Sequence, residues 1–534
     1  MDSPFRSLLH TNTVPSDADC DRIRTLLHRS RKQVEDLSRK IHDMGRQLDD
    51  LTRQRDDLTQ YIDAHFALVS PARRLPQDII RAIFVACMPS TRNAVMSPDD
   101  SPLLLCQICS AWRQLALTTP QLWASLHIVV PSPSKINQLT QTVGSWLSRS
   151  GIVPLSISMV TSSSYPTFDD INIDHDLTEL LSLLADMTSR WHRIRMIPPA
   201  FSSFKPLSHL SAADFPILKT LSIGSSSLFG VASVESSPWQ SLSLLTAPNL
   251  RSVSISSGYD FAHLQLPWTQ LTHLSIDGTP YVWPRPFNIQ DAITVMQRCL
   301  NLRTCGFILA ETADPSVPLA PVCLPYLWHL SLVDDMGDLE ADRLFTKLSL
   351  PNLRSLKYTC VSIPIFHTPR HIFLPSLERL SLNVSGLESS HLIESLRLLP
   401  LLIDLELVRD PVLASAPGTT MSLPDPDFLA RLIPHSTSPL CPNLRRLHLS
   451  HFRALSDETI LAFIRARTTS VSDAGPVARL ERIVVQLARE STSNLAAALE
   501  EVIAGGLQLS LEYSSPPSFQ KYSPWENAEE KDLV

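Results

Sequence analysis

The sequence predicts an α/β protein with an N-terminal coiled-coil helix, a small all-α segment and a C-terminal irregular solenoid of strand repeats. Three observations lead to this prediction: an apolar heptad pattern over residues 20–70, two short apolar helices within 71–125, and a recurring L-x-x-L-x-L pattern within 126–514. Residues 1–19 and 515–534 lie outside these patterns, and we expect both to be disordered.

Composition favours a soluble protein that binds neither nucleic acid nor membrane. Of the 534 residues, 44% are hydrophobic and 19% are charged, and the net charge of −7 is not the basic balance that nucleic-acid binding needs. No stretch approaches a membrane span, and no basic start with a long apolar run indicates a secretory signal. Nine cysteines without framework spacing fit a reducing compartment. We therefore expect a cytoplasmic or nuclear location.

A narrow apolar seam indicates a coiled coil over residues 20–70. Because the other faces are dense in charged residues and Gln, the seam covers only two-sevenths of the surface over about five heptads. Gly45 and Arg55, which occupies a seam position, cost stability and can set the register. Self-association, docking back on the C-terminal domain and a solvated single helix remain open. The apolar seam residues are Val34, Leu37, Ile41, Met44, Leu48, Leu51, Leu58 and Ile62.

Residues 71–123 contain two short apolar helices separated by a polar insert, Ser90–Ser101. Leu75-Pro76 opens the first helix, because proline fits the first turn, where its missing N–H costs nothing. Its apolar face consists of Ile79, Ile80, Ile83 and Phe84. The second helix carries Leu104, Leu105, Ile108, Cys109, Trp112 and Leu115. Two helices this short do not make a core alone, so they must pack on the rest of the chain or on a partner.

The ordered combination of these residues resembles an F-box of the kind common in fungal proteins. The pattern runs L-P-x-D-I-I-x-x-I-F from Leu75 to Phe84, continues with an aliphatic-Cys-x-x-W-R segment and closes with P-x-L-W at Pro120–Trp123. The long insert departs from a compact F-box. A helical hairpin that packs on the rest of the chain is the alternative. The resemblance implies binding to the Skp-type adaptor of a cullin–RING ubiquitin ligase through Leu75, Pro76, Ile79, Ile80, Ile83, Phe84, Ile108, Cys109 and Trp112.

After Trp123 the chain is serine-rich, punctuated by proline and repetitive. The pattern L-x-x-L-x-L, often with Pro two residues before its first Leu, recurs at intervals of 21 to 42 residues. Its copies are Leu218–Ile223, Leu250–Ile255, Leu271–Ile276, Leu302–Phe307, Leu327–Leu332, Leu353–Tyr358, Leu377–Leu382, Leu402–Leu407, Leu444–Leu449 and Leu480–Val485, with an earlier copy at Trp191–Met196. Helices are expected at Asp176–Ser189, Ile289–Arg298, Ser390–Leu398, Glu458–Ala466 and Asn494–Ile503.

Strand, loop and helix at this period indicate a solenoid with a parallel sheet, and the region resembles the leucine-rich-repeat domains often joined to F-boxes. An α/β fold whose strands share the leucine spacing is the alternative. The Asn or Cys expected eight residues after the first Leu is absent, so we expect irregular repeats. That position holds Ser226, Gly258, Thr279, Ala310, Asp335, Val361, Ser385, Asp410 and Phe452.

The residues between the leucines are expected on the open side of the sheet, because side chains alternate along a strand. They are small and hydroxylic in the early copies and ionisable in the later copies. A solvated strand face is one interpretation. The other is a protein-binding face made of Lys357, Arg379, Asp404, Glu406, Arg446 and His448.

No catalytic or metal-binding motif is present, so we expect no enzyme activity, no cofactor and no metal. The only C-x-x-C, Cys106–Cys109, has no second Cys or His pair nearby. The combined resemblance implies a substrate-recognition subunit of an SCF-type ubiquitin ligase. Its F-box would bind the adaptor and through it the cullin, and its repeats would bind the target protein. A non-catalytic scaffold without a ubiquitin role is the main alternative, and an unrecognised hydrolase is a third.

Overall fold

The computed structural model forms two compact units, Met1–Ala82 and Ile83–Val534, which we describe separately. The expected disordered tail, residues 515–534, lies outside the described residues. The structure describes residues 3–69, 71–131, 135–161, 173–198, 201–224, 242–256, 264–276, 287–309, 317–334, 340–360, 374–385, 387, 389–409, 428–433, 440–452, 455–468, 477–487 and 495–513.

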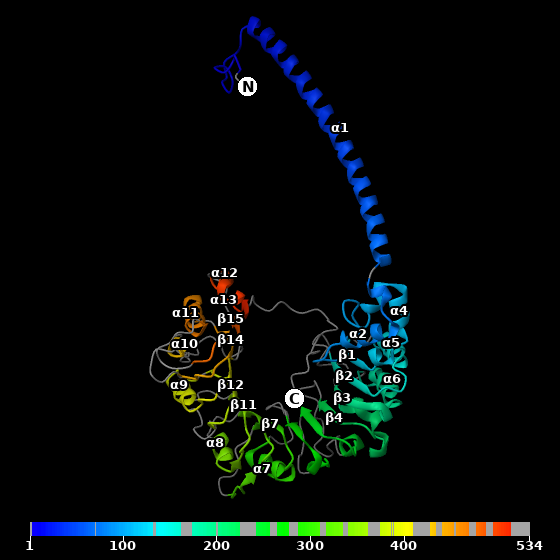
Figure 1. Cartoon of the computed structure of the whole chain (residues 1–534), viewed down its shortest axis with the longest axis vertical. Coiled ribbons are helices and arrows are strands. Elements are labelled where there is room, and N and C mark those ends of the chain that lie inside the picture. Colours follow the sequence, from blue (N-terminus) through cyan, green and yellow to red (C-terminus); the bar gives the residue numbers. More distant parts are fainter. Residues whose placement is uncertain are drawn as a thin grey trace. The chain divides into compact units, whose positions relative to one another are not determined.

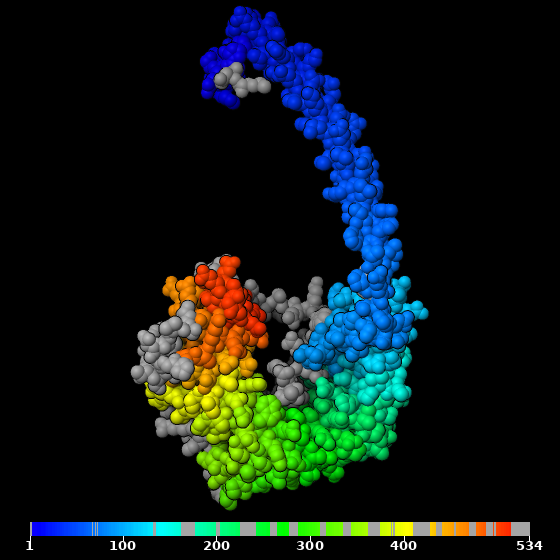
Figure 2. Space-filling model, in the orientation of Figure 1, coloured from blue at the N-terminus to red at the C-terminus, as the bar shows by residue number. Residues whose placement is uncertain are grey.

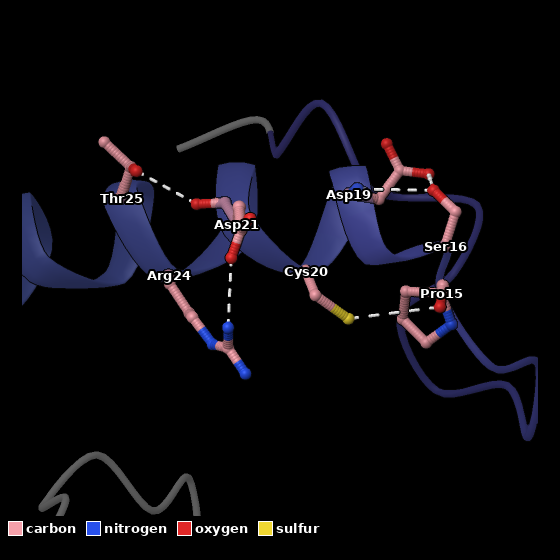
Figure 3. A network of polar contacts seen from close by, with 7 residues as sticks. All are labelled: Pro15, Ser16, Asp19, Cys20, Asp21, Arg24 and Thr25. Atoms are coloured by element: carbon pink, nitrogen blue, oxygen red, sulfur yellow. Dashed lines mark hydrogen bonds and ion pairs between the residues drawn. The ribbon is translucent and has the colours of Figure 1, made fainter.

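One long helix, α1 (Asp17–Val69), makes up most of the first unit (Figure 1). Ser16 opens it: its hydroxyl accepts the backbone N–H of Asp19 at 3.3 Å and donates to the Asp19 carboxylate at 2.6 Å (Figure 3). This contact satisfies one of the N–H groups that the first turn leaves without a helical partner. The helix spans nearly the whole predicted range 20–70, so the helical part of that prediction is confirmed.

The second unit is built on a 14-stranded parallel sheet in which neighbouring strands follow one another in chain order. The strands are β1 (Ser125–Val130), β2 (Leu155–Thr161), β3 (Trp191–Ile197), β4 (Thr220–Gly224), β5 (Ser252–Ser256), β6 (His273–Ile276), β7 (Thr304–Leu309), β9 (His329–Asp334), β11 (Ser355–Cys360), β12 (Arg379–Asn383), β13 (Asp404–Val408), β14 (Arg446–Phe452), β15 (Arg482–Leu487) and β16 (Gln508–Tyr513). A separate pair consists of β8 (Val322–Cys323) and β10 (Leu348–Ser349).

Helices of the second unit lie on one side of this sheet (Figure 1). They are α5 (Ile136–Ser148), α6 (Ile173–Ala185), α7 (Ile289–Arg298), α8 (Glu340–Phe345), α9 (Ser389–Arg397), α10 (Phe428–Arg431), α11 (Asp457–Thr468), α12 (Leu495–Ala498) and α13 (Glu500–Ala504). Short 3-10 helices are η1 (Pro71–Arg74), η2 (Pro120–Trp123), η4 (Thr188–Arg190), η5 (Phe201–Leu207), η6 (Ala212–Asp214), η8 (Ser243–Thr246) and η10 (Trp268–Gln270). In the space-filling view, each stretch packs beside those that precede and follow it in the chain (Figure 2).

Every predicted copy of the leucine pattern lies on a strand, which confirms the strand prediction. The predicted helix at Ile289–Arg298 has the same bounds as α7, whereas the helix expected at Asn494–Ile503 is two short helices, α12 and α13, and Asn494 lies outside the described residues. The edge strands β1 and β16, and β2 next to β1, were not predicted, because their sequences lack the leucine spacing.

A tight turn sets the start of nearly every repeat. The backbone N–H of the first Leu donates to the carbonyl three residues earlier, at 3.0 to 3.4 Å, in nine of the ten copies; Leu480 instead donates to Arg467. Proline often stands second in this turn, where its fixed φ is favourable. The first leucines are at most 1% exposed, so each turn delivers one side chain into the core: Leu218, Leu250, Leu271, Leu302, Leu327, Leu353, Leu377, Leu402, Leu444 and Leu480.

Asparagines cross-link successive turns from a position that the leucine pattern does not include. Asn352 donates through its side chain to the carbonyl of Pro325 at 2.7 Å, which belongs to the turn of the preceding repeat. Asn249, Asn301 and Asn443 make the equivalent bond at 2.6 to 3.0 Å. The asparagine stands directly before the first Leu rather than eight residues after it. Of the nine residues from Ser226 to Phe452 that stand eight positions after a first Leu, only Ser385 and Phe452 lie among the described residues.

Candidate protein-interaction surfaces

Helix α2 (Gln77–Ala86) divides its predicted apolar residues between a buried and an exposed face. Ile80 is 8% exposed and Phe84 is fully buried, whereas Ile79 and Ile83 are 45% and 40% exposed. The two faces follow from helical spacing, because residues four apart lie on the same side. Only the exposed pair is accessible to a partner that leaves this packing intact.

Trp112 packs within the chain rather than standing free. Its ring meets Phe84 edge-on, with centroids 4.9 Å apart, a favourable aromatic geometry. Trp112 is half-buried, so part of its surface stays accessible. The pair of rings joins α2 to α4 (Ser110–Leu117). This arrangement gives Trp112 a structural role in addition to the partner contact that the resemblance implies.

The predicted second helix is two helices, which corrects that part of the prediction. α3 (Leu105–Ile108) and α4 are separated by Cys109, whose backbone is extended at φ −160° and ψ 167°. The Cys109 sulfur accepts the backbone N–H of Trp112 at 3.5 Å, so this residue caps α4 instead of continuing α3. Ile108 is 56% exposed at the end of α3.

Leu75 and Pro76, the remaining residues that the resemblance assigns to adaptor contact, are both exposed directly before α2. Cys109 is also exposed. Burial raises the pKa of the nearby Cys106 thiol, which lowers its reactivity because the thiolate is the reactive form. Both cysteines are free thiols.

The polar insert Ser90–Ser101 is attached to the edge of the sheet. Asn93 is 4% exposed, and its amide oxygen accepts hydrogen bonds from the hydroxyls of Ser125 at 2.9 Å and Ser156 at 2.8 Å. Its amide nitrogen donates to the Ser158 hydroxyl at 2.9 Å. Asn93 therefore joins the insert to the first two strands. This role is not visible in the sequence, because the partners of Asn93 lie 32 to 65 residues away.

Backbone contacts strengthen this attachment. Val95 forms an isolated parallel bridge with His127 of β1, and the His127 N–H donates to the Ala94 carbonyl at 2.7 Å. Val95 and Ala94 are fully buried. An ion pair between Arg92 and Asp100, 3.0 Å apart, joins the two arms of the insert. The insert thus covers one edge of the sheet, where strands otherwise leave backbone groups unpaired.

The tryptophan of the P-x-L-W segment belongs to the core. Trp123 is fully buried, its indole N–H donates to the Ala116 carbonyl at 2.9 Å, and its ring packs edge-on against Trp146 of α5 at 4.8 Å. The Arg149 guanidinium lies 4.6 Å from the same ring, a cation–π distance. Trp123 therefore fixes η2 to the helix that follows β1.

The six ionisable residues predicted on the open strand face lie together in two rows across β11 to β14. One row places Arg379, Asp404 and Arg446 opposite one another, and the other contains Lys357, Glu406 and His448. The six side chains lie close together because equivalent positions of successive repeats are opposite each other in a parallel sheet.

Most of these charges are paired with one another. The Arg446 guanidinium lies 3.0 Å from the Asp404 carboxylate, and Nδ1 of His448 lies 3.2 Å from Oε1 of Glu406. A hydrogen bond from His448 is the largest cause that lowers the pKa of Glu406 to about 2. Lys357 adds to this lowering by its charge, against the opposing effect of burial.

Two cations of the face stay exposed. Lys357 and Arg379 form no ion pair within the part of the chain that the structure describes. Because paired charges already neutralise each other, these two side chains are the ones that an acidic partner segment would meet first.

The polar network continues beyond the predicted residues onto β16. Ser450 donates to the side-chain oxygen of Gln486 at 3.0 Å, and the Gln486 amide donates to Glu512 at 3.0 Å. These residues are opposite one another in register on β14, β15 and β16. The signal is weak in the sequence, since β16 lies outside the leucine pattern.

The described residues contain no group of three His, Cys, Asp or Glu side chains placed to hold a metal ion. Among the same residues, no helix combines the length and apolar character needed to cross a membrane.

A scan of protein-family models and a search of curated proteins find no match to this chain.

Proposed function

We propose that this chain is the substrate-recognition subunit of an SCF-type cullin–RING ubiquitin ligase. The observation that carries the proposal is the exposure of Leu75, Ile79, Ile83 and Ile108, which are apolar and stand where the F-box resemblance expects adaptor contacts. Large aliphatic side chains left between 38% and 56% exposed favour a partner that covers them. Covering each one would contribute about 1 kcal/mol, roughly half the value for complete burial.

Residues assigned to the adaptor contact then divide into two groups. Ile80, Phe84 and half-buried Trp112 hold the helices in place, because they are packed inside the chain. Leu75, Pro76, Ile79, Ile83, Ile108 and Cys109 form the contact itself. Substitutions in the first group are expected to reduce folding as well as binding. Substitution of Ile79, Ile83 or Ile108 in the second group should reduce binding alone, whereas substitution of Cys109 would also remove the cap of α4.

The parallel sheet is, in this proposal, an irregular leucine-rich-repeat solenoid that binds the target protein. Support comes from the buried first leucine of each repeat and from the strand order, in which each repeat pairs only with its neighbours. Exposed Lys357 and Arg379 would contact an acidic segment of the target. The chain would act by raising the local concentration of that target near the ligase, and catalysis would belong to other subunits.

The direct test is recovery of a purified Skp-type adaptor with the full-length chain. We expect Ile79→Asp and Ile83→Asp each to lower recovery at least about tenfold, because a carboxylate would be buried against the adaptor. Ile152→Asp is the matched control, since Ile152 is 93% exposed and lies outside the F-box-like segment. Equal recovery with the wild-type chain and all three variants would overturn the proposal.

One observation favours a second function, that of an interaction scaffold without a ubiquitin role. The insert covers the edge of the sheet through Asn93 and the bridge between Val95 and His127. In that case the F-box-like helices would serve as an N-terminal cap of the solenoid, which repeat arrays require. Absence of adaptor binding, together with intact target binding, would favour this scaffold.

A further inference from the structure

Helix α1 exposes the whole of its predicted apolar seam. The side chains of the seam are each between 50% and 70% exposed, over a helix of 53 residues. Leaving so many aliphatic side chains in water is unfavourable, and a stripe this narrow suits another helix better than a globular surface. The exposed residues are Val34, Leu37, Ile41, Met44, Leu48, Leu51, Leu58 and Ile62.

We propose that α1 pairs with α1 of a second copy of this chain in a parallel, in-register, two-stranded coiled coil. The seam residues occupy two heptad positions. Position a contains the β-branched residues Val34, Ile41 and Ile62, and position d is dominated by leucine, as at Leu37 and Leu51. β-Branched residues at a with leucine at d favour two parallel strands.

Three ion pairs of α1 lie away from the pairing surface. Each joins an Asp to an Arg three residues later, and the pairs repeat every seven residues. All of them use positions c and f, which lie opposite the seam. They satisfy one another within a single helix, so pairing does not have to desolvate them. The pairs are Asp36–Arg39, Asp43–Arg46 and Asp50–Arg53.

The residues at positions e and g, which flank the seam, are compatible with pairing between two copies of the same helix. In a parallel pair, each g residue lies beside the e residue five positions later on the other helix. Between Gln33 and Thr59 these combinations contain a single charge, Lys40, which meets Gly45. Nearer the start of the helix Asp19 meets Arg24 and Leu26 meets Arg31, so no like charges oppose each other. The remaining combinations between Gln33 and Thr59 are Gln33 with Ser38, Gln47 with Thr52 and Gln54 with Thr59.

Arg55 explains why the helices would pair in register. It is the charged residue at position a within the seam, and its Nε donates to the Asp56 carboxylate at 2.9 Å. When the two helices are in register, both Arg55 side chains lie in the same layer of the coiled coil, and only that one layer is not apolar. If one helix were shifted by one heptad, one Arg55 would face Leu48 and the other would face Ile62, so two layers would no longer be apolar. A single polar layer at position a is known to fix register at some cost in stability.

Cys20 can show whether the two α1 helices are parallel or antiparallel. It lies seven residues before Leu27 and therefore also at position a, on the first turn of α1, where its sulfur is 3.9 Å from the Pro15 carbonyl (Figure 3). Two Cys20 side chains share a layer in a parallel pair. In an antiparallel pair they would be separated by about 75 Å, the length of the helix at 1.5 Å per residue.

A parallel pair would have a functional consequence that is independent of the ubiquitin proposal. Both copies would leave the rod at Val69, so the two second units would be tethered at the same end. Two binding surfaces held together this way bind a target with repeated motifs more tightly than one surface does.

The test is the mass of the full-length chain in solution under reducing conditions, by light scattering. We expect twice the chain mass of 59.5 kDa. Leu37→Asp with Leu51→Asp should give a monomer, whereas His28→Asp with His42→Asp should stay dimeric, because those residues lie at position b, off the seam. A monomeric wild-type chain, a larger assembly, or dimeric Leu37→Asp/Leu51→Asp would overturn the proposal.

Direction is tested by mild oxidation with diamide, followed by electrophoresis without reductant. We expect a covalent dimer that is lost in Cys20→Ser, and a second covalent dimer through an introduced cysteine in Cys20→Ser/Ser30→Cys, since position 30 is a d position. A chain that is dimeric by mass but forms neither cross-link would overturn the parallel arrangement.

Discussion

At the scale of single residues, position along a helix or strand decided which predicted residues are accessible. Ile79 and Ile80 are neighbours of the same chemistry, yet the first is 45% exposed and the second 8%. The charged strand residues show the same division, because Asp404 and Glu406 are paired with basic residues while Lys357 is exposed. Accessibility, rather than residue type, therefore identifies the side chains to test for partner binding.

Glu406 is expected to make stability depend on pH in the acid range. Its pKa is about 2 in the folded chain, below the ordinary value of 4.5, so its contribution is fully present above pH 4.5 and is lost as the pH falls toward 2. Glu406→Gln should remove the part of the acid-induced loss of stability that comes from Glu406. Urea unfolding between pH 6 and 2 measures it, with Glu481→Gln as a control on an exposed carboxylate. Parallel pH profiles for the wild-type chain and Glu406→Gln would contradict the prediction.

At the scale of elements, the local sequence decides where helices and strands form, and contacts decide where they end. Pro325 and Leu327 form a turn that starts β9, and the same arrangement starts most repeats. In contrast, the apolar pattern from Leu104 to Leu115 continues through Cys109, although the helix does not. Apolar spacing alone therefore does not reveal a break whose backbone groups are capped by a side chain.

The paired α1 helices give a prediction at this scale. Arg55→Ile replaces the charged layer with the β-branched residue that the other layers use, so we expect the dimer dissociation constant to fall at least about tenfold. Analytical ultracentrifugation of the full-length chain measures it. Arg53→Ile, which changes the neighbouring outward position f, is the matched control and should not tighten the dimer. An unchanged constant in Arg55→Ile would argue against Arg55 facing its counterpart.

At the scale of the second unit, contacts between distant segments join the F-box-like helices to the sheet. Asn93 bonds to three serines on or next to the first two strands, and Trp123 and Trp146 pack together across β1. These contacts place residues 83–124 in the same compact unit as the sheet. The helical segment and the repeats are therefore expected to unfold together.

Asn93→Ala should lower the free energy of unfolding of the second unit by about 1–3 kcal/mol, because it removes three hydrogen bonds that a buried side chain makes to Ser125, Ser156 and Ser158. Asn352→Ala is the control: it removes a single hydrogen bond at an exposed position and should cost about 0.5–1 kcal/mol. Urea unfolding followed by tryptophan fluorescence measures both. Equal effects of the two substitutions would show that the insert is not held by Asn93.

The long helix, the repeated strands and the absence of a recognisable catalytic motif can all be predicted from the amino-acid sequence. These features arise from local patterns: the heptad spacing of α1, and the leucine that follows a proline turn at positions such as Leu353. Three features become visible only in three dimensions: Asn93 attaches the insert to β1 and β2, Cys109 interrupts the second helix, and Glu406 pairs with His448. Each of these depends on which neighbour a side chain meets, and the spacing of apolar residues does not encode that choice.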